Sequence, residues 1–278
     1  MASDLSQAHE FASWDSYQRF ARSVRVERRY ISKADDAAFL RTVVATITNR
    51  DVTLNAGQIL YRAQRGIDMR EIPGRWGGVD DVVPAGFGRE RMKPRRSAAT
   101  EGRANPSGIP VLYLGTTVEN VIGEIRPWIG AAVSVAQFEL RKSVRAIDLS
   151  RHHGKSPLHE IGLMRLFDRE PLTREEKELA VWIDIDNAFS RPVTSSDETA
   201  DYAPTQIITE LFRDAGYDAV IYKSSFGEQG FNVALFDIDA ADPVSCAPYE
   251  VTEVKLQYRE IGSPWFASDD SRASTTRE

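Results

Sequence analysis

Strand-like runs recur after residue 57, and they constrain the fold more than any other feature of the sequence. In such runs alternate side chains point to opposite faces of a sheet, so one face can be buried and the other solvated. We therefore expect a sheet to form the core of this part of the chain. The runs are GQILYRAQRG (57–66), IPVLYLG (109–115), AAVSVAQFEL (131–140), SVRAIDLS (143–150), DAVIYKSS (218–225), FNVALFDI (231–238) and YEVTEVKLQY (249–258).

The first fifty or so residues have a helical period instead. Apolar residues recur every three or four positions in residues 4–24 and in ISKADDAAFLRTVVATI (31–47), where Ser32 is a candidate N-cap. Residues 157–189 and 203–216 also have helical character. A helical start followed by strands and a few further helices predicts an α+β fold with an N-terminal helical region.

Two Thr-x-x-Glu sequences mark expected helix starts. Thr116 with Glu119, and Thr173 with Glu176, have the spacing of a capping box, in which each side chain accepts a hydrogen bond from the other residue's backbone N–H. We expect a short helix after Thr116 that ends near Ile125, and a longer one within residues 157–189.

Charge and cysteine content argue against several classes of function. The chain has 35 basic and 41 acidic residues, a net charge of -6, which argues against a general nucleic-acid binder. A single cysteine, Cys246, and four histidines offer little for a metal site, so we expect no metal. The sequence has no apolar run of membrane-spanning length and does not begin like a signal peptide. We expect a cytoplasmic protein with no membrane partner.

A long segment rich in Gly, Pro and Arg, residues 66–108, has little periodicity, and such segments are often functional loops. Between Arg89 and Arg103 it carries six basic residues against two acidic ones. This cluster is consistent with a solvated mobile loop or with a lip that attracts anions. Charge count by itself favours the solvated loop.

The segment EGRANPSGIPVLYLGTTVENVIGE (101–124) places Arg103 in a loop, Tyr113 in a strand and Glu124 on a helix. Glycine-rich nucleotide motifs are absent from the chain, so side chains would have to hold any nucleotide. Arginine suits this task because its guanidinium donates bidentate hydrogen bonds to phosphate, and Arg62 could join Arg103 on one diphosphate. An ion pair explains Arg62 equally well, core packing explains Tyr113, and periodicity alone favours a solvent-exposed Glu124.

Taken together, these residues resemble the RES-domain family, which is named after an arginine, a glutamate and a serine and includes many toxins of toxin–antitoxin pairs. The resemblance runs from LYRAQ through GRANPSGIPVLYLGTTVENVIGE to YAPTQIITELFRDAGYDAVIYKSSFGEQGFNVALF, most of residues 57–239. The helical start also resembles the extension of longer members. The residues at family positions are Arg62 and Arg103 for the arginines, Tyr113 for a strand tyrosine, Glu124 for the glutamate, and Ser224, with Ser225 as an alternative, for the serine.

Two features depart from the family pattern. Some members have an aromatic residue after the first arginine, where this chain has Ala63, and the nearest aromatic residue is Tyr61 on the other side of the arginine. The helical stretch 157–189 exceeds the minimal domain and is expected to be an insertion. The implied organisation is an N-terminal helical extension (1–55), a RES-type catalytic domain (56–260) and a polar tail (261–278).

The resemblance implies a fold like that of ADP-ribosyltransferases, with a split mixed sheet, and an enzyme that consumes NAD. Such an enzyme cleaves the nicotinamide–ribose bond and uses phosphate or water as the acceptor. Arg62 and Arg103 would hold the diphosphate, Tyr113 would pack against nicotinamide or its ribose, and Ser224 would orient the ribose. Glu124 would stabilise the positive charge at the anomeric carbon or orient the nucleophile. NAD is then a substrate, phosphate is a candidate co-substrate, and no cofactor is implied.

Two other functions use the same residues. One is transfer of ADP-ribose to a macromolecule, and the other is a non-catalytic module that binds NAD or another nucleotide. A toxin also needs restraint, so the resemblance implies an antitoxin on a separate chain. The oligomeric state, including a homo-oligomer, is left open.

Overall fold

A mixed eight-stranded sheet forms the centre of the computed structural model, which describes residues 9–167, 170–191, 199–226, 230–256, 258 and 260–263. The strand order is β1-β7-β8-β9-β5-β2-β6-β10, and β3 and β4 form a separate two-stranded sheet. The strands are β1 (Asp51–Leu54), β2 (Ile59–Arg65), β3 (Asp68–Pro73), β4 (Val79–Ala85), β5 (Leu112–Gly115), β6 (Ala132–Leu140), β7 (Val144–Asp148), β8 (Ala219–Lys223), β9 (Phe231–Leu235) and β10 (Ala241–Glu250).

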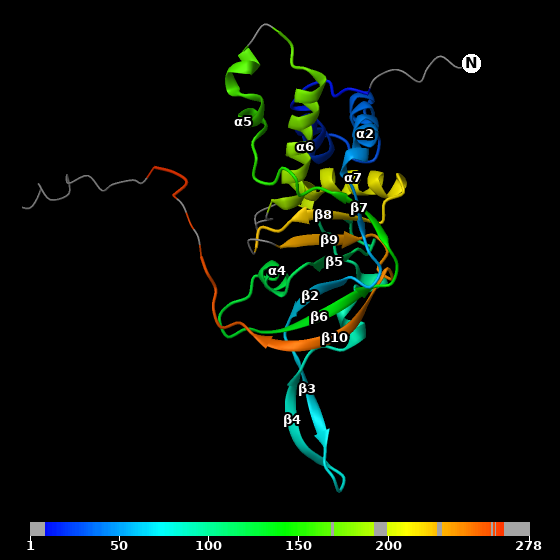
Figure 1. Cartoon of the computed structure of the whole chain (residues 1–278), viewed down its shortest axis with the longest axis vertical. Helices are drawn as coiled ribbons and strands as arrows, with labels where there is room; N and C mark the ends of the chain where they lie inside the picture. The colour runs from blue at the N-terminus through cyan, green and yellow to red at the C-terminus, as the bar shows by residue number, and fades with distance from the viewer. Residues whose placement is uncertain are drawn as a thin grey trace, which may run out of the picture.

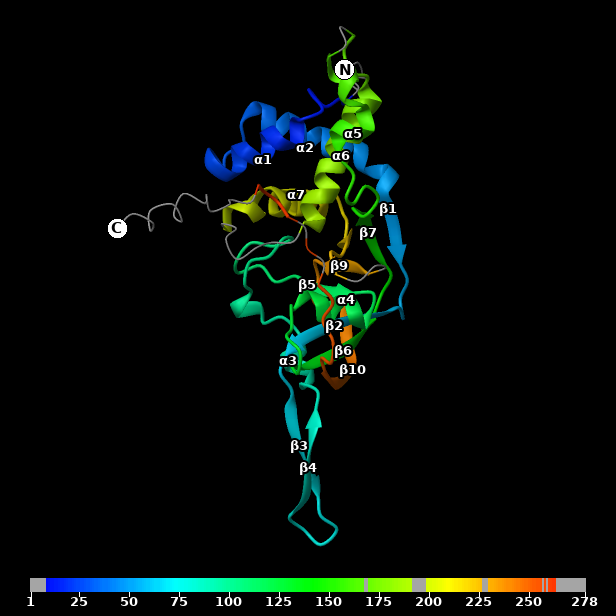
Figure 2. The same ribbon diagram turned by 90° about the vertical axis from the view of Figure 1, so that its left-hand side faces the viewer.

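Most of the helices lie at one end of the molecule, where Figure 1 shows α2, α6 and α7 beside β7 and β8, while the β3–β4 hairpin projects from the opposite end. Figure 2 shows α3 and α4 between these two ends. This arrangement confirms the predicted α+β class with an N-terminal helical region. None of the described helices is long and apolar enough to cross a membrane. The helices are α1 (Ser16–Val26), α2 (Ala34–Thr46), α3 (Arg89–Met92), α4 (Val118–Glu124), α5 (Pro157–Ile161), α6 (Arg174–Ser190) and α7 (Ala203–Asp214), with short 3-10 helices η1 (Ile47–Arg50), η2 (Arg96–Ala98), η3 (Leu163–Phe167) and η4 (Thr199–Tyr202).

The sheet divides between β5 and β2. Strand β5 pairs with β9 over four residues, but it pairs with β2 only through Tyr61 and Gly115. Beyond that pair β2 continues alongside β6, so the half with β9 and the half with β6 part from each other. The likeness to ADP-ribosyltransferases stays a prediction.

The two faces of the sheet are covered differently. On one face α1, α2, α6 and α7 bury a cluster that includes Phe20, Phe39, Ile185, Phe212 and Val220. The N-terminal helices therefore share a core with α7, and β1 joins the same sheet by pairing with β7. The predicted boundary between residues 55 and 56 stays a prediction.

A second cluster fills the other face and includes Leu60, Met92, Leu112, Phe138 and Val233. Its members come from both halves of the sheet and from α3. The short helix α4 lies on the first face, over β2 and β5, and it packs so closely that a side chain on Gly115 would meet Val121 Cγ1 at 2.5 Å. A glycine at position 115 thus brings α4 against the sheet.

Several predicted helix starts were wrong by one or more residues. Helix α1 begins at Ser16 rather than near residue 4, and residues 4–8 of that prediction lie outside the described residues. The N-cap of α2 is Lys33 and not Ser32.

The predicted capping boxes had different outcomes. The N-cap of α4 is Thr117, whose side chain accepts from the Asn120 N–H, because the Thr116 hydroxyl accepts from the Phe231 N–H on β9 instead. The predicted capping box between Thr173 and Glu176 is confirmed at the start of α6.

The long segment 66–108 is more regular than predicted, since it contains the β3–β4 hairpin and α3. Every residue of β3 is exposed, and β4 buries only Ala85 at its end, so the hairpin lacks the alternating pattern of a half-buried strand. The last strand was also misplaced: β10 spans Ala241–Glu250 and pairs with β6, whereas residues 251–256 belong to no strand. Because β10 pairs along the whole of β6, the last strand begins and ends nearer the N-terminus than the local alternation predicted.

Candidate active site

Glu124, at the end of α4, is joined to two buried residues from distant parts of the chain. The Ser224 hydroxyl donates to Glu124 Oε1 at 2.8 Å, and Asn232 Nδ2 donates to the same oxygen at 2.6 Å. The side chains of Ser224 and Asn232 are buried, whereas Glu124 is exposed, as periodicity predicted. A carboxylate is thus fixed at the surface by donors in the interior, and its Oε2 accepts no hydrogen bond from the described residues.

Adjacent strands place the two donors. Ser224 directly follows β8, and Asn232 lies on β9, where it pairs with Tyr222 of β8. Asn120 of α4 donates to Asn232 Oδ1 at 3.0 Å, which orients the Asn232 amide so that its NH₂ group points to Glu124. Gly230 allows this approach, because a Cβ there would meet Asn120 Cβ at 2.7 Å.

Arg103 lies beside Tyr222, the β8 residue two positions before Ser224. Its guanidinium is 5.4 Å from the Tyr222 ring centroid and donates to the backbone oxygen of Arg191. Burial raises the pKa of Tyr222 to about 12, and both Arg103 and Glu124 act on this hydroxyl electrostatically. One buried tyrosine is therefore in range of both charged residues.

Tyr113 links this region to a cavity. Its hydroxyl donates to Asn105 Oδ1 at 2.7 Å and accepts from the Ala104 N–H at 2.9 Å, which fixes the loop that carries Arg103. A side chain on Gly102 would meet the Tyr113 hydroxyl at 2.6 Å, so the loop needs glycine there to lie this close. Because burial also raises the pKa of Tyr113, this hydroxyl stays protonated at neutral pH.

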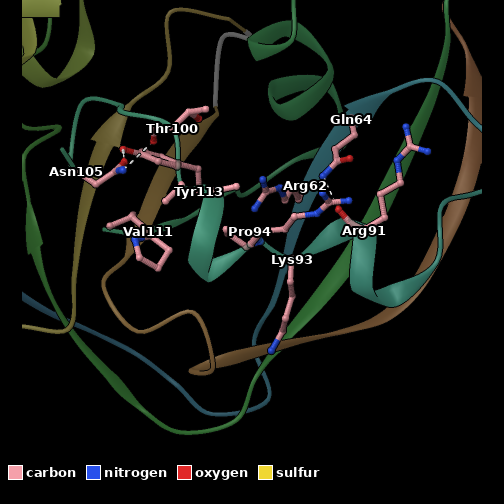
Figure 3. Close-up of a pocket in the computed structure, with 13 residues that line it drawn as sticks. Arg62, Gln64, Arg91, Lys93, Pro94, Thr100, Asn105, Val111 and Tyr113 are labelled. Carbon is pink, nitrogen blue, oxygen red and sulfur yellow. Dashed lines mark hydrogen bonds between the residues drawn. The ribbon is translucent and has the colours of Figure 1, made fainter. Parts of the chain in front are cut away.

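The cavity lies where β2 and β5 part and has a volume of about 350 Å³. Figure 3 shows Arg62 from β2 and Tyr113 from β5 among its walls. Arg103 is not part of the described lining, so the predicted convergence of Arg62 and Arg103 on one point is not seen. The lining residues are Arg62, Gln64, Arg91, Lys93, Pro94, Arg95, Ala98, Ala99, Thr100, Asn105, Pro110, Val111 and Tyr113.

Arg62 has no compensating partner among the described residues. Its Nη1 is buried and makes no hydrogen bond there. Burial lowers the pKa of Arg62 to about 10, so the guanidinium remains protonated near neutral pH. A buried cation without an acceptor is costly unless a ligand supplies the anion. The ion pair considered as an alternative for Arg62 is absent from the described residues.

Two predicted site residues lie elsewhere. Tyr61 packs with the cluster under α4, on the face of β2 opposite to Arg62. The Ser225 hydroxyl donates to the backbone oxygen of Ser190, so Ser224 rather than Ser225 contacts Glu124. No group of three or more potential metal ligands occurs in the part of the chain that the structure describes.

The sequence did not lead us to Asn232, and charge count gave too little weight to the basic segment, residues 89–103. Asn232 was detectable as a lone amide in the apolar run FNVALF, where a buried polar side chain needs a partner. The basic segment is not a freely solvated loop, since Met92 is fully buried and Arg91, Lys93 and Arg95 line the cavity with Arg62.

Comparison with known proteins identifies the family. No curated protein matches the chain. Among solved structures, the crystal structure of the M. tuberculosis MbcT–MbcA toxin–antitoxin complex is similar with a TM-score of 0.42 and 14% identity, covering 75% of this chain and 92% of that chain. The RES domain model matches residues 84–258, which include Arg103, Glu124 and Ser224 but not Arg62. With well over half of its length matched in this way, the chain belongs to the RES domain family.

Proposed function

We infer that this chain is an enzyme that consumes NAD by cleaving the nicotinamide–ribose bond, and that it is the toxin of a toxin–antitoxin pair. The observation that carries this inference is the Glu124 carboxylate, held by Ser224 and Asn232 near Arg103. Membership of the RES family supports it, because Glu124, Ser224 and Arg103 lie within the matched residues.

The reaction places its main demand on a negative charge. When the bond between ribose C1 and the pyridinium nitrogen breaks, its electron pair returns to the nitrogen, and nicotinamide leaves as a neutral molecule without needing an acid. Positive charge develops on the ribose. The free Oε2 of Glu124 supplies a fixed negative charge for this oxocarbenium-like state, and the two hydrogen bonds to Oε1 hold it in place beforehand.

The acceptor completes the reaction in one of two ways. In phosphorolysis a phosphate oxygen bonds to C1 and gives ADP-ribose 1''-phosphate. In hydrolysis a water oxygen bonds to C1, one proton is released to solvent, and ADP-ribose is formed. In this proposal Arg62 binds the diphosphate, Arg103 contacts the nucleotide at the end nearer to Glu124, and the Tyr113 ring packs against the nicotinamide ribose.

Incubation of the purified chain with NAD, with and without phosphate, tests the reaction through separation of the products. We expect nicotinamide release by the wild type and by Ser225→Ala, a matched control for Ser224→Ala, which should be impaired. Absence of nicotinamide under both conditions would overturn the proposal. Labelled NAD in a cell lysate tests the transferase alternative, since label on a macromolecule would favour transfer.

The toxin assignment has a separate test. Expression of the wild-type chain without a partner should arrest growth and deplete cellular NAD, whereas expression of Glu124→Gln should do neither. Growth arrest by both chains at equal protein levels would show that toxicity does not depend on the reaction. An antitoxin on a separate chain is part of this proposal, and rescue of growth by its co-expression is expected.

A further inference from the structure

The cavity between β2 and β5 holds more positive charge than Arg62 supplies. Arg91, Lys93 and Arg95 also line it, and the described lining contains no Asp or Glu. Four cationic side chains around one space repel one another unless each has a counter-charge nearby.

Some cations of the basic segment are already compensated outside the cavity. Lys93 Nζ lies 2.7 Å from Asp242 Oδ1 and 3.2 Å from Asp239 Oδ1, and Figure 3 shows Lys93 extending away from Arg62. Arg96 also pairs with Asp239. These pairs attach the segment to the start of β10 and leave Lys93 and Arg96 little charge to offer a ligand.

Arg95 and Arg91 differ from these residues. Arg95 forms no ion pair with a described carboxylate. Arg91 reaches Asp68 only at 4.0 Å and its guanidinium lies 3.4 Å from the Phe87 ring centroid, so its side chain extends away from Arg62, as Figure 3 shows, and it stands at the rim of the cavity. Together with Arg62, they are the lining cations with little or no counter-charge among the described residues.

The backbone that carries these arginines is anchored to the sheet. Met92 is fully buried, and Gln64 Nε2, on β2 near Arg62, donates to the Arg91 backbone oxygen at 2.8 Å. An anion therefore meets a preformed site and pays little for ordering the segment.

We propose that Arg95 completes an anion site around Arg62 that binds the diphosphate group of a nucleotide, and that Arg91 adds positive charge at the rim of this site. Tyr113 separates this site from Arg103, because its ring lines the cavity and its hydroxyl contacts the loop that carries Arg103. The diphosphate is thus assigned to Arg62 and Arg95, with Arg91 at the rim, and Arg103 serves the ribose end near Glu124. The identity of the nucleotide as NAD rests on the proposed function.

Binding of inorganic pyrophosphate and of ADP, measured by calorimetry at low ionic strength, tests the site without turnover. We expect both to bind the wild type, and Arg95→Ala to weaken each about tenfold, the usual scale for one charge-assisted contact. Arg96→Ala is the matched control. It also removes one positive charge, at the next position in the chain, but from a side chain that is paired with Asp239. It should therefore change binding less than twofold. Equal weakening by both variants, or no binding to the wild type, would overturn the proposal.

Steady-state kinetics then separate this inference from the proposed function. Arg95→Ala should raise the KM for NAD about tenfold and leave kcat nearly unchanged, while Arg91→Ala should act in the same direction. Turnover of NAD with a KM indifferent to both variants would overturn the anion site and leave the enzyme proposal standing. Pyrophosphate binding that depends on Arg95, without nicotinamide release, would support the anion site and overturn the enzyme proposal.

Discussion

Arg50 is buried and Arg62 is half-buried, and their surroundings are opposite. Arg50 Nη1 donates to Asp186 Oδ1 at 2.7 Å and to the Asp148 backbone oxygen at 2.9 Å, and its guanidinium lies 4.1 Å from the Trp182 ring centroid. Arg62 Nη1 is buried and has no acceptor among the described residues. The fold compensates the first charge and leaves the second for a ligand.

The network around Arg50 is closed by His152, whose backbone N–H and Nδ1 lie 3.1 Å and 2.9 Å from Asp186 Oδ2. It connects η1, the loop after β7 and α6, and so fixes the helical region on the sheet. A buried ion-pair network of this kind favours one packing of the helices on the sheet but adds little net stability. An uncompensated charge that faces a cavity is instead typical of a binding site.

The largest expected effect is on folding. Arg50→Met should lower the free energy of unfolding by about 3–5 kcal/mol, because it leaves Asp186 buried without its cation. Arg62→Met removes a charge that has no carboxylate partner and should cost no stability while impairing NAD turnover. Urea denaturation of both variants measures the difference. Similar destabilisation by Arg50→Met and Arg62→Met would contradict the difference between a compensated and an uncompensated arginine.

In the candidate active site, Glu124→Gln should lower kcat about 100-fold with little change in the midpoint of urea denaturation. The substituted amide keeps an oxygen that can accept from Ser224 and Asn232, so only the negative charge is lost. Nicotinamide release at saturating NAD is the measurement. A kcat within threefold of the wild type would remove Glu124 from the reaction.

Asn232→Asp should change the pH dependence of the same carboxylate. It replaces a donor 2.6 Å from Glu124 Oε1 by a second carboxylate, and two carboxylates this close share a proton, which raises one pKa of the pair. We expect about tenfold lower kcat at neutral pH, recovered as the pH rises. A uniform loss at every pH would indicate a purely structural role for Asn232.

The smallest effect concerns a half-buried acid of α6. Asp184 has a buried Oδ2 without a partner, and burial raises its pKa to about 6 from 3.8. The folded state therefore favours the protonated acid, and stability is lost as pH rises from about 4 to above 6. Asp184→Asn should stabilise the chain by about 1 kcal/mol at pH 7 and by nothing below pH 4. Equal stabilisation at both pH values would contradict this origin.

Helices with a buried face were predictable, as were strands with alternating burial. The prediction of a capping box at Thr173 was correct because both of its hydrogen bonds join residues three positions apart. At Thr116 a similar pattern was misleading, because a bond to Phe231 of β9 takes up the hydroxyl. The β3–β4 hairpin escaped prediction since β3 buries no side chain.

By itself the sequence determined the α+β class and the RES family, and it singled out Glu124, Arg103 and either Ser224 or Ser225 as candidate site residues. Only the tertiary structure decided that Ser224 and not Ser225 reaches Glu124, that Asn232 joins them, and that Arg62 faces a cavity with Arg91 and Arg95. The physical reason is distance along the chain. Hydrogen bonds between residues 100 and 108 positions apart, and a cavity formed where two strands part, depend on packing that local periodicity does not encode.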